Sequence, residues 1–384
     1  MKRAAKLCSV ILLIVSSTTG CWNLREPNQL AFALGAGLDL TKDGQLEISA
    51  QIAIPSRLGG GQEAGGGTGN KSFRVISATG NNVYDTLPKL QKQLSRSYFI
   101  GHRRIILIGQ RMAEHGIGSV LDEFVRNPQS DLRSMIFVVK DGQAKDIFSV
   151  EPFFEPFTSS ELVQQQTTLG LKRHYFRNFL SDTLTQGIQP MLPVVSLTDT
   201  KQVVYSGTAV FNKDDGLKLV GFLNTEDSFY ANWITNRQTH LAINSIVKRG
   251  NDSIGLKLLS LGRRVQVKMI DKQIKIDVLL TGEGTIVENN TNLDPTKRND
   301  LQIIEDKLSE TTQRSIQQLI EKVQKQHKTD IFGFGVHVHR QYPEQWKTLK
   351  RDWNATFPEL KVSVKVELHC KDPGETNSSI KSIP

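Results

Sequence analysis

The stretches Leu30–Leu40 and Leu46–Ile54 near the N-terminus have the pattern of β-strands, and in the second stretch apolar side chains at every other position lie on one face. Lys42-Asp43-Gly44 lies between the two stretches, and an Asp-Gly pair favours the tight turn of a β-hairpin. This pattern predicts a hairpin. The glycine-rich stretch Leu58–Gly69 follows it without any phosphate-binding spacing, and we interpret it as a loop.

Strand-like and helix-like periods then alternate, which is typical of an α/β or α+β domain. The helical stretches place apolar residues three and four positions apart, and the strand-like stretches are short apolar runs. The pattern predicts strands at Lys71–Ser77, Arg104–Ile108 and Leu132–Val139, and helices at Asn82–Leu94 and Ala113–Arg126.

A second block begins near Val203 with a predicted hairpin, Val203–Asn212 and Leu217–Leu223. A long helix is expected to begin at Asp294, a suitable N-cap, with Pro295 in its first turn. The remaining predicted elements are a helix at Ser228–Ile234, strands near Leu241–Lys248, Val265–Met269 and Lys275–Thr285, a helix at Pro343–Phe357 and a strand at Val362–Leu368.

The whole pattern predicts a mixed α/β or α+β fold, with mixed sheets flanked by helices in a multi-domain, water-soluble body. We place an N-terminal α/β domain at residues 21–197 and a C-terminal α/β region at 203–373, which has room for two subdomains. Residues 374–384 are polar, and we interpret them as a disordered tail.

The first 20 residues have the three parts of a secretory signal. Met1–Lys6 is basic, Leu7–Val15 is apolar and too short to span a bilayer, and small residues lead to Thr18-Thr19-Gly20-Cys21. This tetrapeptide resembles a lipobox, with threonine where leucine is usual. We therefore predict cleavage between Gly20 and Cys21, with a diacylglycerol thioether and an N-acyl chain on Cys21. The alternative is a secreted protein in which Cys21 carries no lipid.

Charge and cysteine content restrict the picture further. The net charge of +9 becomes +6 when Lys2, Arg3 and Lys6 leave with the signal, which favours an anionic membrane surface. No nucleic-acid motif is present, so we expect no nucleic-acid partner. Once Cys8 is removed and Cys21 is lipidated, Cys370 is the remaining cysteine. An intramolecular disulfide is therefore excluded.

Catalytic and metal-binding motifs are missing: there is no GxSxG, HExxH or CxxC in the sequence. His337 and His339 would share one face of a strand, but two ligands are too few for a metal site. His369 and Cys370 would point to opposite faces. Gly101-His102-Arg103-Arg104 offers basic groups for an anion, although we favour a turn before a strand. We expect no catalytic residue, cofactor or metal.

Several short motifs, in order along the mature chain, resemble the C-subunit lipoproteins of spore germinant receptors, the Ger(x)C family of endospore-forming bacteria. Asn23 departs from the aspartate that is usual in the first motif. The motifs are Cys21-Trp22-Asn23-Leu24-Arg25-Glu26, Tyr98-Phe99-Ile100-Gly101-His102, Ile105–Gly109, Gly116-Ile117, Ser206-Gly207-Thr208-Ala209-Val210-Phe211, Leu219-Val220-Gly221, Asp330-Ile331-Phe332-Gly333-Phe334-Gly335, Pro343, Trp346 and Trp353.

The physical interpretation of these motif residues is structural. An indole at Trp22 suits a membrane interface, and Glu26 stands close by. Gly333 and Gly335 allow a tight turn or a close approach of backbone. Trp346 and Trp353 are seven residues apart, which places them on one face of the predicted helix as core anchors.

The resemblance implies a non-enzymatic subunit of a nutrient receptor, needed for spore germination. It implies anchoring through Cys21 on the outer face of the spore inner membrane, beside membrane subunits A and B. It does not establish whether this subunit binds a nutrient directly. The alternative function is a substrate-binding lipoprotein of an uptake system, which should have two similar lobes around a cleft. An anchored hydrolase is disfavoured because no catalytic set is visible.

Overall fold

A computed structural model describes residues 3, 26–57, 71–246, 252–270 and 273–374 of the chain. The predicted lipidation site Cys21, its neighbours Gly20 and Trp22, and the glycine-rich stretch Leu58–Gly69 lie outside these residues, as do residues 375–384. The predictions made for them therefore stay predictions.

The first half of the described chain builds a nine-stranded mixed sheet. Its central strands β1, β5, β6 and β7 are parallel, and antiparallel hairpins form both ends. The strand order is β3 (Phe73–Gly80), β2 (Leu46–Ala53), β1 (Leu30–Leu40), β5 (Ile105–Gly109), β6 (Met135–Val139), β7 (Met191–Leu197), β8 (Val203–Asn212) and β9 (Lys218–Leu223), with the short β4 (Ser97–Phe99) paired to β1.

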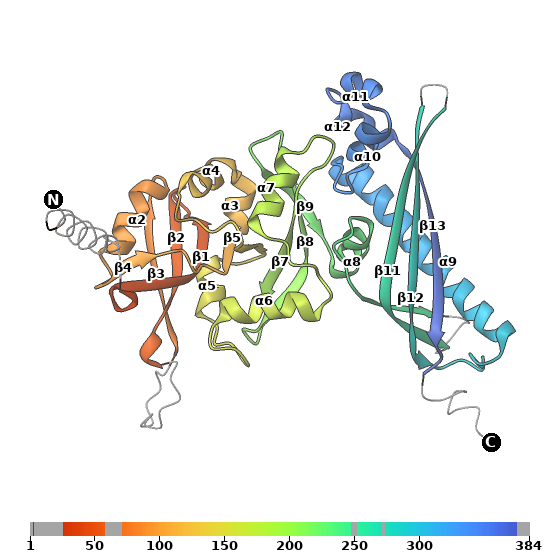
Figure 1. The fold of residues 1–384 in the computed structure, drawn as a ribbon, viewed down its shortest axis with the longest axis horizontal. Coiled ribbons are helices and arrows are strands. Elements are labelled where there is room, and N and C mark those ends of the chain that lie inside the picture. Colours follow the sequence, from red (N-terminus) through yellow and green to blue (C-terminus); the bar gives the residue numbers. More distant parts are fainter. Residues whose placement is uncertain (1–2, 4–25, 58–70, 247–251, 271–272, 375–384) are drawn as a thin grey trace.

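Helices cover both faces of this sheet (Figure 1). In β5, Ile106 and Ile108 pack towards one set of helices, whereas Ile105 and Leu107 pack towards the other. Because both faces are buried, the strand is an uninterrupted apolar run, as parallel strands usually are. The first face carries α2 (Val83–Gln91), α3 (Gln110–His115), α4 (Gly118–Arg126) and α7 (Phe176–Leu184), and the second carries α5 (Ala144–Ser149) and α6 (Thr158–Thr168).

The second sheet has four strands and one long covering helix, α9 (Arg298–Lys322) (Figure 1). The long strands β11 and β12 form an antiparallel hairpin, and β13 returns parallel to β12 after the helices α9 to α12. The strands are β10 (Leu241–Ile246), β11 (Ser253–Ile270), β12 (Gln273–Asn289) and β13 (Lys361–Asp372), and the other helices are α8 (Thr225–Ile234), α10 (Phe334–Gln341), α11 (Pro343–Leu349) and α12 (Trp353–Thr356).

Helix α9 also covers the free edge of β13. Four of its side chains, spaced four residues apart, bond to the backbone of that strand as a further strand would. The bonds are Cys370 N–H to Glu305, Leu368 N–H to Ser309, Val366 N–H to Gln313, and the Gln317 amide to the carbonyl of Val362. The edge is therefore closed to pairing with another chain.

The fold class that the sequence predicts is confirmed: the chain is a mixed α+β protein with two mixed sheets flanked by helices. The first sheet continues past residues 197–203, where the sequence places a domain boundary, and that division into domains stays a prediction. β7 ends at Leu197 and pairs with β8, which begins at Val203. The hairpin of β8 and β9 thus completes the first sheet, and α8 follows between the two sheets (Figure 1).

Several predicted elements differ in the structure. The helix expected at Ala113–Arg126 is two helices, α3 and α4, and Gly116 lies between them. Helix α9 begins at Arg298 rather than at Asp294, whose carboxylate instead accepts the N–H and hydroxyl of Thr296. The helix expected at Pro343–Phe357 is divided into α11 and α12. Among the described helices, none is long and apolar enough to cross a bilayer.

Helix α9 offers a matched test of how the second sheet is stabilised. Ile316 is fully buried against the sheet, whereas Ile303 on the same helix is 48% exposed. We expect Ile316→Ala to lower the free energy of unfolding by about 2–5 kcal/mol, because it leaves a cavity. Ile303→Ala should change it by less than about 1 kcal/mol. Urea unfolding measures both, and equal effects would contradict this packing.

Candidate functional site

The motif at Asp330–Gly335 folds around a buried carboxylate. Asp330 has no exposed surface, and its two oxygens accept four N–H groups. Oδ1 accepts the backbone N–H of Gly333 at 2.9 Å and of Phe334 at 3.1 Å. Oδ2 accepts the N–H of Gly335 at 2.8 Å and the indole Nε1–H of Trp353 at 3.0 Å. The carboxylate therefore caps the N-terminus of α10, where a negative charge is favourable.

Burial governs the acidity of this group. Removal from water raises the pKa of Asp330 to about 6, although the four N–H donors oppose that change. No cation forms an ion pair with Asp330 in the described part of the chain. The backbone and indole donors thus provide the stabilisation that a counter-ion would otherwise supply.

The same motif contacts the first sheet through two glycines. A Cβ on Gly335 would lie 2.6 Å from the Cα of Gly187, in the loop between α7 and β7. The backbone N–H of Val336 donates to the Gly187 carbonyl, and the N–H of Gln189 donates to the Asp330 carbonyl. Two backbones meet here at a distance that only glycine permits. We call Asp330, Gly333, Gly335, Trp353 and Gly187 the Asp330 junction.

The two motif tryptophans stand beside this junction. Trp346 and Trp353 are buried, with ring centroids 5.2 Å apart in an edge-to-face arrangement. They lie on separate helices, α11 and α12, and not on one face of a single helix as the sequence predicts. The Trp346 indole N–H reaches Gln186 Oε1 of the first sheet's loop, and His339 stacks on its ring.

A cleft of about 480 Å³ opens next to the junction. Asp214 lies on its wall and accepts the amides of Gln189 and Asn354, both at 2.8 Å. Lys350 and Arg351 contribute positive charge. These polar groups join the first sheet to α12 within one network, so the cleft lies at a seam between the two halves of the molecule.

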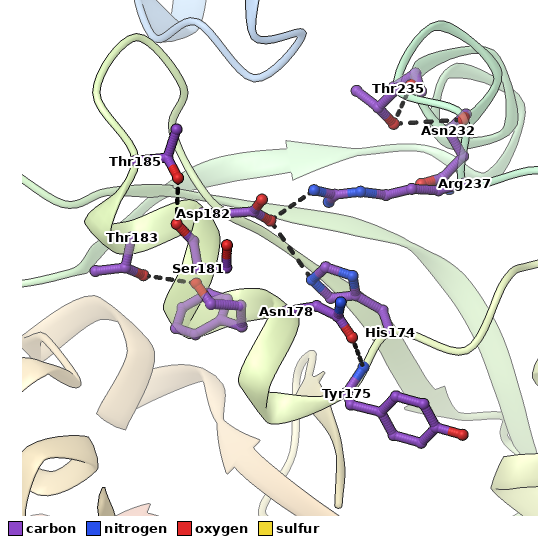
Figure 2. A network of polar contacts seen from close by, with 12 residues as sticks. His174, Tyr175, Asn178, Ser181, Asp182, Thr183, Thr185, Asn232, Thr235 and Arg237 are labelled. Carbon is purple, nitrogen blue, oxygen red and sulfur yellow. Dashed lines mark hydrogen bonds and ion pairs between the residues drawn. The ribbon is translucent and has the colours of Figure 1, made fainter. Parts of the chain in front are cut away.

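A second polar network ties α7 to the segment that follows α8 (Figure 2). Asp182 Oδ2 lies 2.6 Å from Arg237 Nη2 and 3.7 Å from His174 Nε2. Burial and the nearby Arg237 hold the pKa of His174 well below its usual value, so the imidazole is neutral at neutral pH. Burial raises the pKa of Asp182, while Arg237 opposes this change. The ion pair is therefore Asp182 with Arg237, and its role is structural.

The histidines considered as metal ligands do not form a site. His337 and His339 lie on helix α10 and not on a strand, so residues two positions apart point in different directions. His369 and Cys370 do lie on strand β13. In the part of the chain that the structure describes, no group of three or more His, Cys, Asp or Glu side chains is arranged to hold a metal ion.

The other motif residues are dispersed. Glu26 is exposed. His102 lies in the turn that precedes β5, and its ring stacks on Phe32 of β1. Gly101 lies in that same turn, so the turn interpretation is confirmed. In β8, a Cβ on Gly207 would lie 2.0 Å from the Leu223 carbonyl oxygen, and Phe211 is fully buried. None of these residues meets the Asp330 junction in the structure.

Sequence analysis missed the residues that complete these networks. Gln186, Gly187, Gln189 and Asp214 stand more than a hundred residues before the Asp330 motif, and no local spacing connects them to it. For the Asp182 network a signal was available in Arg237, since a charged side chain that becomes buried usually has a specific partner.

Comparison with known proteins identifies the family. The model described as "Spore germination protein N-terminal domain" matches residues 23–197, and "Spore germination B3/ GerAC like, C-terminal" matches residues 206–374. The chain belongs to the Ger(x)C family of spore germination proteins. Members of this family are germinant receptor subunits, and the chain has a role in spore germination.

Individual relatives agree with this membership. YfkR of Bacillus subtilis (strain 168) is 30% identical over 375 residues, which cover 95% of each chain. "Spore germination protein KC" of the same organism is 27% identical over 406 residues, covering 99% of this chain and 98% of that one. The crystal structure of the GerBC protein covers 89% of this chain and 99% of its own, with a TM-score of 0.57 and 17% identity, and so shares the fold.

The hydrogen bonds of the Asp330 junction predict that replacing Asp330 by asparagine, which has nearly the same shape, lowers the stability of the fold. Asp330→Asn keeps the shape but turns an NH₂ group towards backbone or indole donors, which leaves buried donors without an acceptor. We expect the free energy of unfolding to fall by about 2–4 kcal/mol at pH 7. The exposed Asp352, next to Trp353, gives the control Asp352→Asn, which should be almost neutral. Urea unfolding that finds equal stabilities for both variants would contradict the assignment.

The raised pKa of Asp330 also predicts a pH dependence. Between the usual value of 3.8 and about 6, the folded chain binds more protons than the unfolded chain, so this group's contribution to stability falls as pH rises through that window. Asp330→Asn removes the titration, whereas Asp39, whose pKa burial also raises to about 6, titrates in both proteins. The stability difference between wild type and variant should therefore shrink from about pH 4 to about pH 6, then level off. A difference that grows with pH would mean that the four donors outweigh burial.

Proposed function

We propose that the chain is a lipid-anchored, non-enzymatic subunit of a nutrient germinant receptor at the spore inner membrane. In this proposal Cys21 carries the lipid, and the folded body assembles with, or couples to, the A and B membrane subunits. The observation that carries it is that both halves of the chain match the two family models, over residues 23–197 and 206–374.

The structure supports a scaffolding role over a catalytic one. Four motif residues are buried, and the polar atoms of the motif bond to backbone and indole groups of the chain itself: Asp330, Gly335, Trp346 and Trp353. Groups that are fully satisfied inside a core are poor candidates for contact with a substrate. Their role is to hold the two sheets in one arrangement, which a subunit needs in order to present a fixed surface to partners.

The alternative, a substrate-binding lipoprotein of an uptake system, receives less support. That class is expected to have two similar lobes around a cleft. Here one sheet has nine strands and the other has four, with different connections. Gln189, Asp214 and Asn354 bond to one another along the wall of the cleft at the seam.

Spores that lack the gene provide the test. In a strain also deprived of sister receptors, we complement the deletion with wild type, Cys21→Ala or Cys370→Ala, and measure membrane partitioning and nutrient-triggered germination. We expect the Cys21→Ala protein to carry no lipid and to leave the membrane fraction, because the two acyl chains of diacylglycerol would anchor the wild type. Spores with this variant should germinate poorly. Cys370→Ala, which changes a cysteine within the folded body, should behave as wild type.

Two outcomes would count against the proposal. Germination that is unaffected by the deletion with every nutrient tested would remove the receptor role. Wild-type protein that carries no lipid and stays out of the membrane fraction would remove the anchor but leave family membership intact.

A further inference from the structure

A polar cleft opens at the edge of the first sheet where the parallel strands β5 and β6 begin. Residues 101–104, which lead into β5, and residues 131–133, which lead into β6, form two parts of its wall. Helix α6 contributes a third part through Ser160 and Gln164. The cleft measures about 530 Å³, which lies within the usual range for a ligand site.

The wall of this cleft carries an excess of positive charge. Among the described residues, four arginines and two carboxylates line it, which leaves two positive charges unbalanced. The arginines are Arg103, Arg104, Arg133 and Arg173, and the carboxylates are Asp131 and Glu155. An anion inside the cleft is therefore electrostatically favoured.

Two of the arginines are held by the chain itself. Asp131 accepts the Nε–H of Arg133, with both carboxylate oxygens 3.2 Å from Nε. These hydrogen bonds lower the pKa of Asp131, and the charge of the buried Arg103 acts in the same direction. Arg103 also donates to the hydroxyl oxygens of Ser134 and Ser130. Asp131 thus balances charge at Arg133 and Arg103.

Arg104 and Arg173 are the cations that remain. Arg104 donates from Nη1 to the neutral hydroxyl of Ser160 at 3.0 Å. The Arg173 side chain is exposed, and among the described residues it forms no hydrogen bond or ion pair. The planar guanidinium group fits phosphate oxygens better than any other side chain does, so this pair suits a phosphate group.

Neutral donors line the same cleft. The Gln164 amide belongs to the wall, as does Tyr175. The Tyr175 hydroxyl points away from the polar network of His174 and Asp182 (Figure 2). Both groups can add hydrogen bonds to an anion that enters the cleft.

An exposed aromatic pair stands next to the cleft in the chain. Phe153 and Phe154 are 81% and 87% exposed, and their rings meet edge to face with centroids 4.6 Å apart. Glu155 of the cleft wall is the next residue. Two large apolar side chains in one loop are unfavourable in water, whereas the interface of a lipid bilayer accommodates them.

From these two features we infer that the cleft binds the phosphate of an anionic phospholipid headgroup, while Phe153 and Phe154 enter the bilayer interface. Arg104 and Arg173 donate to the phosphate oxygens. Free phosphate offers the same oxygens, but a soluble anion gains nothing from the aromatic pair, which favours the lipid. The inference goes beyond the proposed receptor role, because it adds a membrane contact that is separate from the lipid on Cys21.

The path of the chain agrees with this orientation. β1 enters the sheet beside the cleft, where the Phe32 ring stacks on His102 and the N–H of Arg104 donates to the Leu34 carbonyl. Cys21 precedes the first residue of β1 by nine positions, a span of at most about 30 Å. If Cys21 is lipidated, as proposed above, its anchor holds this edge of the sheet close to a membrane.

The test is vesicle co-sedimentation of the mature chain, residues 21–384, in which Cys21→Ala removes the acyl anchor. Vesicles of phosphatidylglycerol mixed with phosphatidylcholine are compared with vesicles of phosphatidylcholine, which has no net charge. We expect the chain to bind the anionic vesicles at least about tenfold more tightly. Because the chain carries no lipid, failure of this test leaves the Cys21 anchor and the receptor role intact.

A charge-matched pair of variants locates the binding. Arg104→Gln with Arg173→Gln should weaken binding to the anionic vesicles by at least about tenfold. The control, Lys42→Gln with Arg111→Gln, removes the same charge at the opposite edge, where Arg111 donates to the Thr41 carbonyl. It should weaken binding by less than about twofold, because salt screens charges at that distance. Arg173→Gln alone, at an exposed side chain, keeps the test valid if the double variant does not fold.

A second matched pair tests the aromatic contact. Phe154 and Tyr84 are both 87% exposed, and Tyr84 lies on α2. Phe154→Ala should weaken vesicle binding by about fivefold or more, whereas Tyr84→Ala should leave it unchanged.

Three results would overturn the inference. Equal binding to anionic and neutral vesicles would remove the headgroup site. Equal losses in the two charge-matched double variants would show attraction to net charge without a defined cleft. Inorganic phosphate that binds the chain in a calorimetric titration, with no binding to either kind of vesicle, would assign the cleft to a soluble anion.

Discussion

A carboxylate without exposed surface can remain in a protein interior only if donors surround it, and Asp330 meets this condition with four N–H groups. The hydrogen bonds to this carboxylate fix the positions of several neighbouring groups. It starts helix α10, orients the Trp353 indole, and sets Gly335 against Gly187 of the first sheet. Much of the arrangement of the C-terminal half relative to the nine-stranded sheet follows from this one group.

The apolar core continues across the same seam. Met191 and Val210 of the first sheet, Trp233 of α8 and Leu256 of the second sheet belong to one cluster of buried residues. The Asp182–Arg237 ion pair adds a polar tie between α7 and the segment after α8 (Figure 2). Apolar burial supplies most of the stabilisation, whereas the polar ties determine a single geometry, because a displaced partner would leave a buried charge unpaired.

The strands were largely predictable because their signal is local. The turn residues Asp43-Gly44 and Asp215-Gly216 mark the hairpins β1–β2 and β8–β9, and β5 is the apolar run of a strand buried on both faces. The helical differences have physical causes. Val-His-Val-His alternates like a strand, but the Asp330 cap, which lies outside that tetrapeptide, makes it part of α10. The Asp294 carboxylate accepts the backbone N–H of Thr296, so it does not cap the first turn of α9.

The candidate site was predictable only in part. The family motifs pointed to Asp330, Gly333, Gly335 and the two tryptophans; Asp330 and both tryptophans are buried, and Asp330 accepts the Trp353 indole N–H. Their partners Gly187 and Gln186 come from a loop about 140 residues earlier, and long-range pairing of this kind leaves no trace in local periodicity.

The central claim is that the Asp330 junction makes the two sheets one body, and differential scanning calorimetry of the purified chain tests it most directly. We predict one cooperative transition for the wild type, with equal calorimetric and van't Hoff enthalpies. Opening the junction by Gly335→Val, which forces a side chain against Gly187, should divide the transition into two. Two independent transitions in the wild type would contradict the account, because they would show that each sheet unfolds without regard to the other.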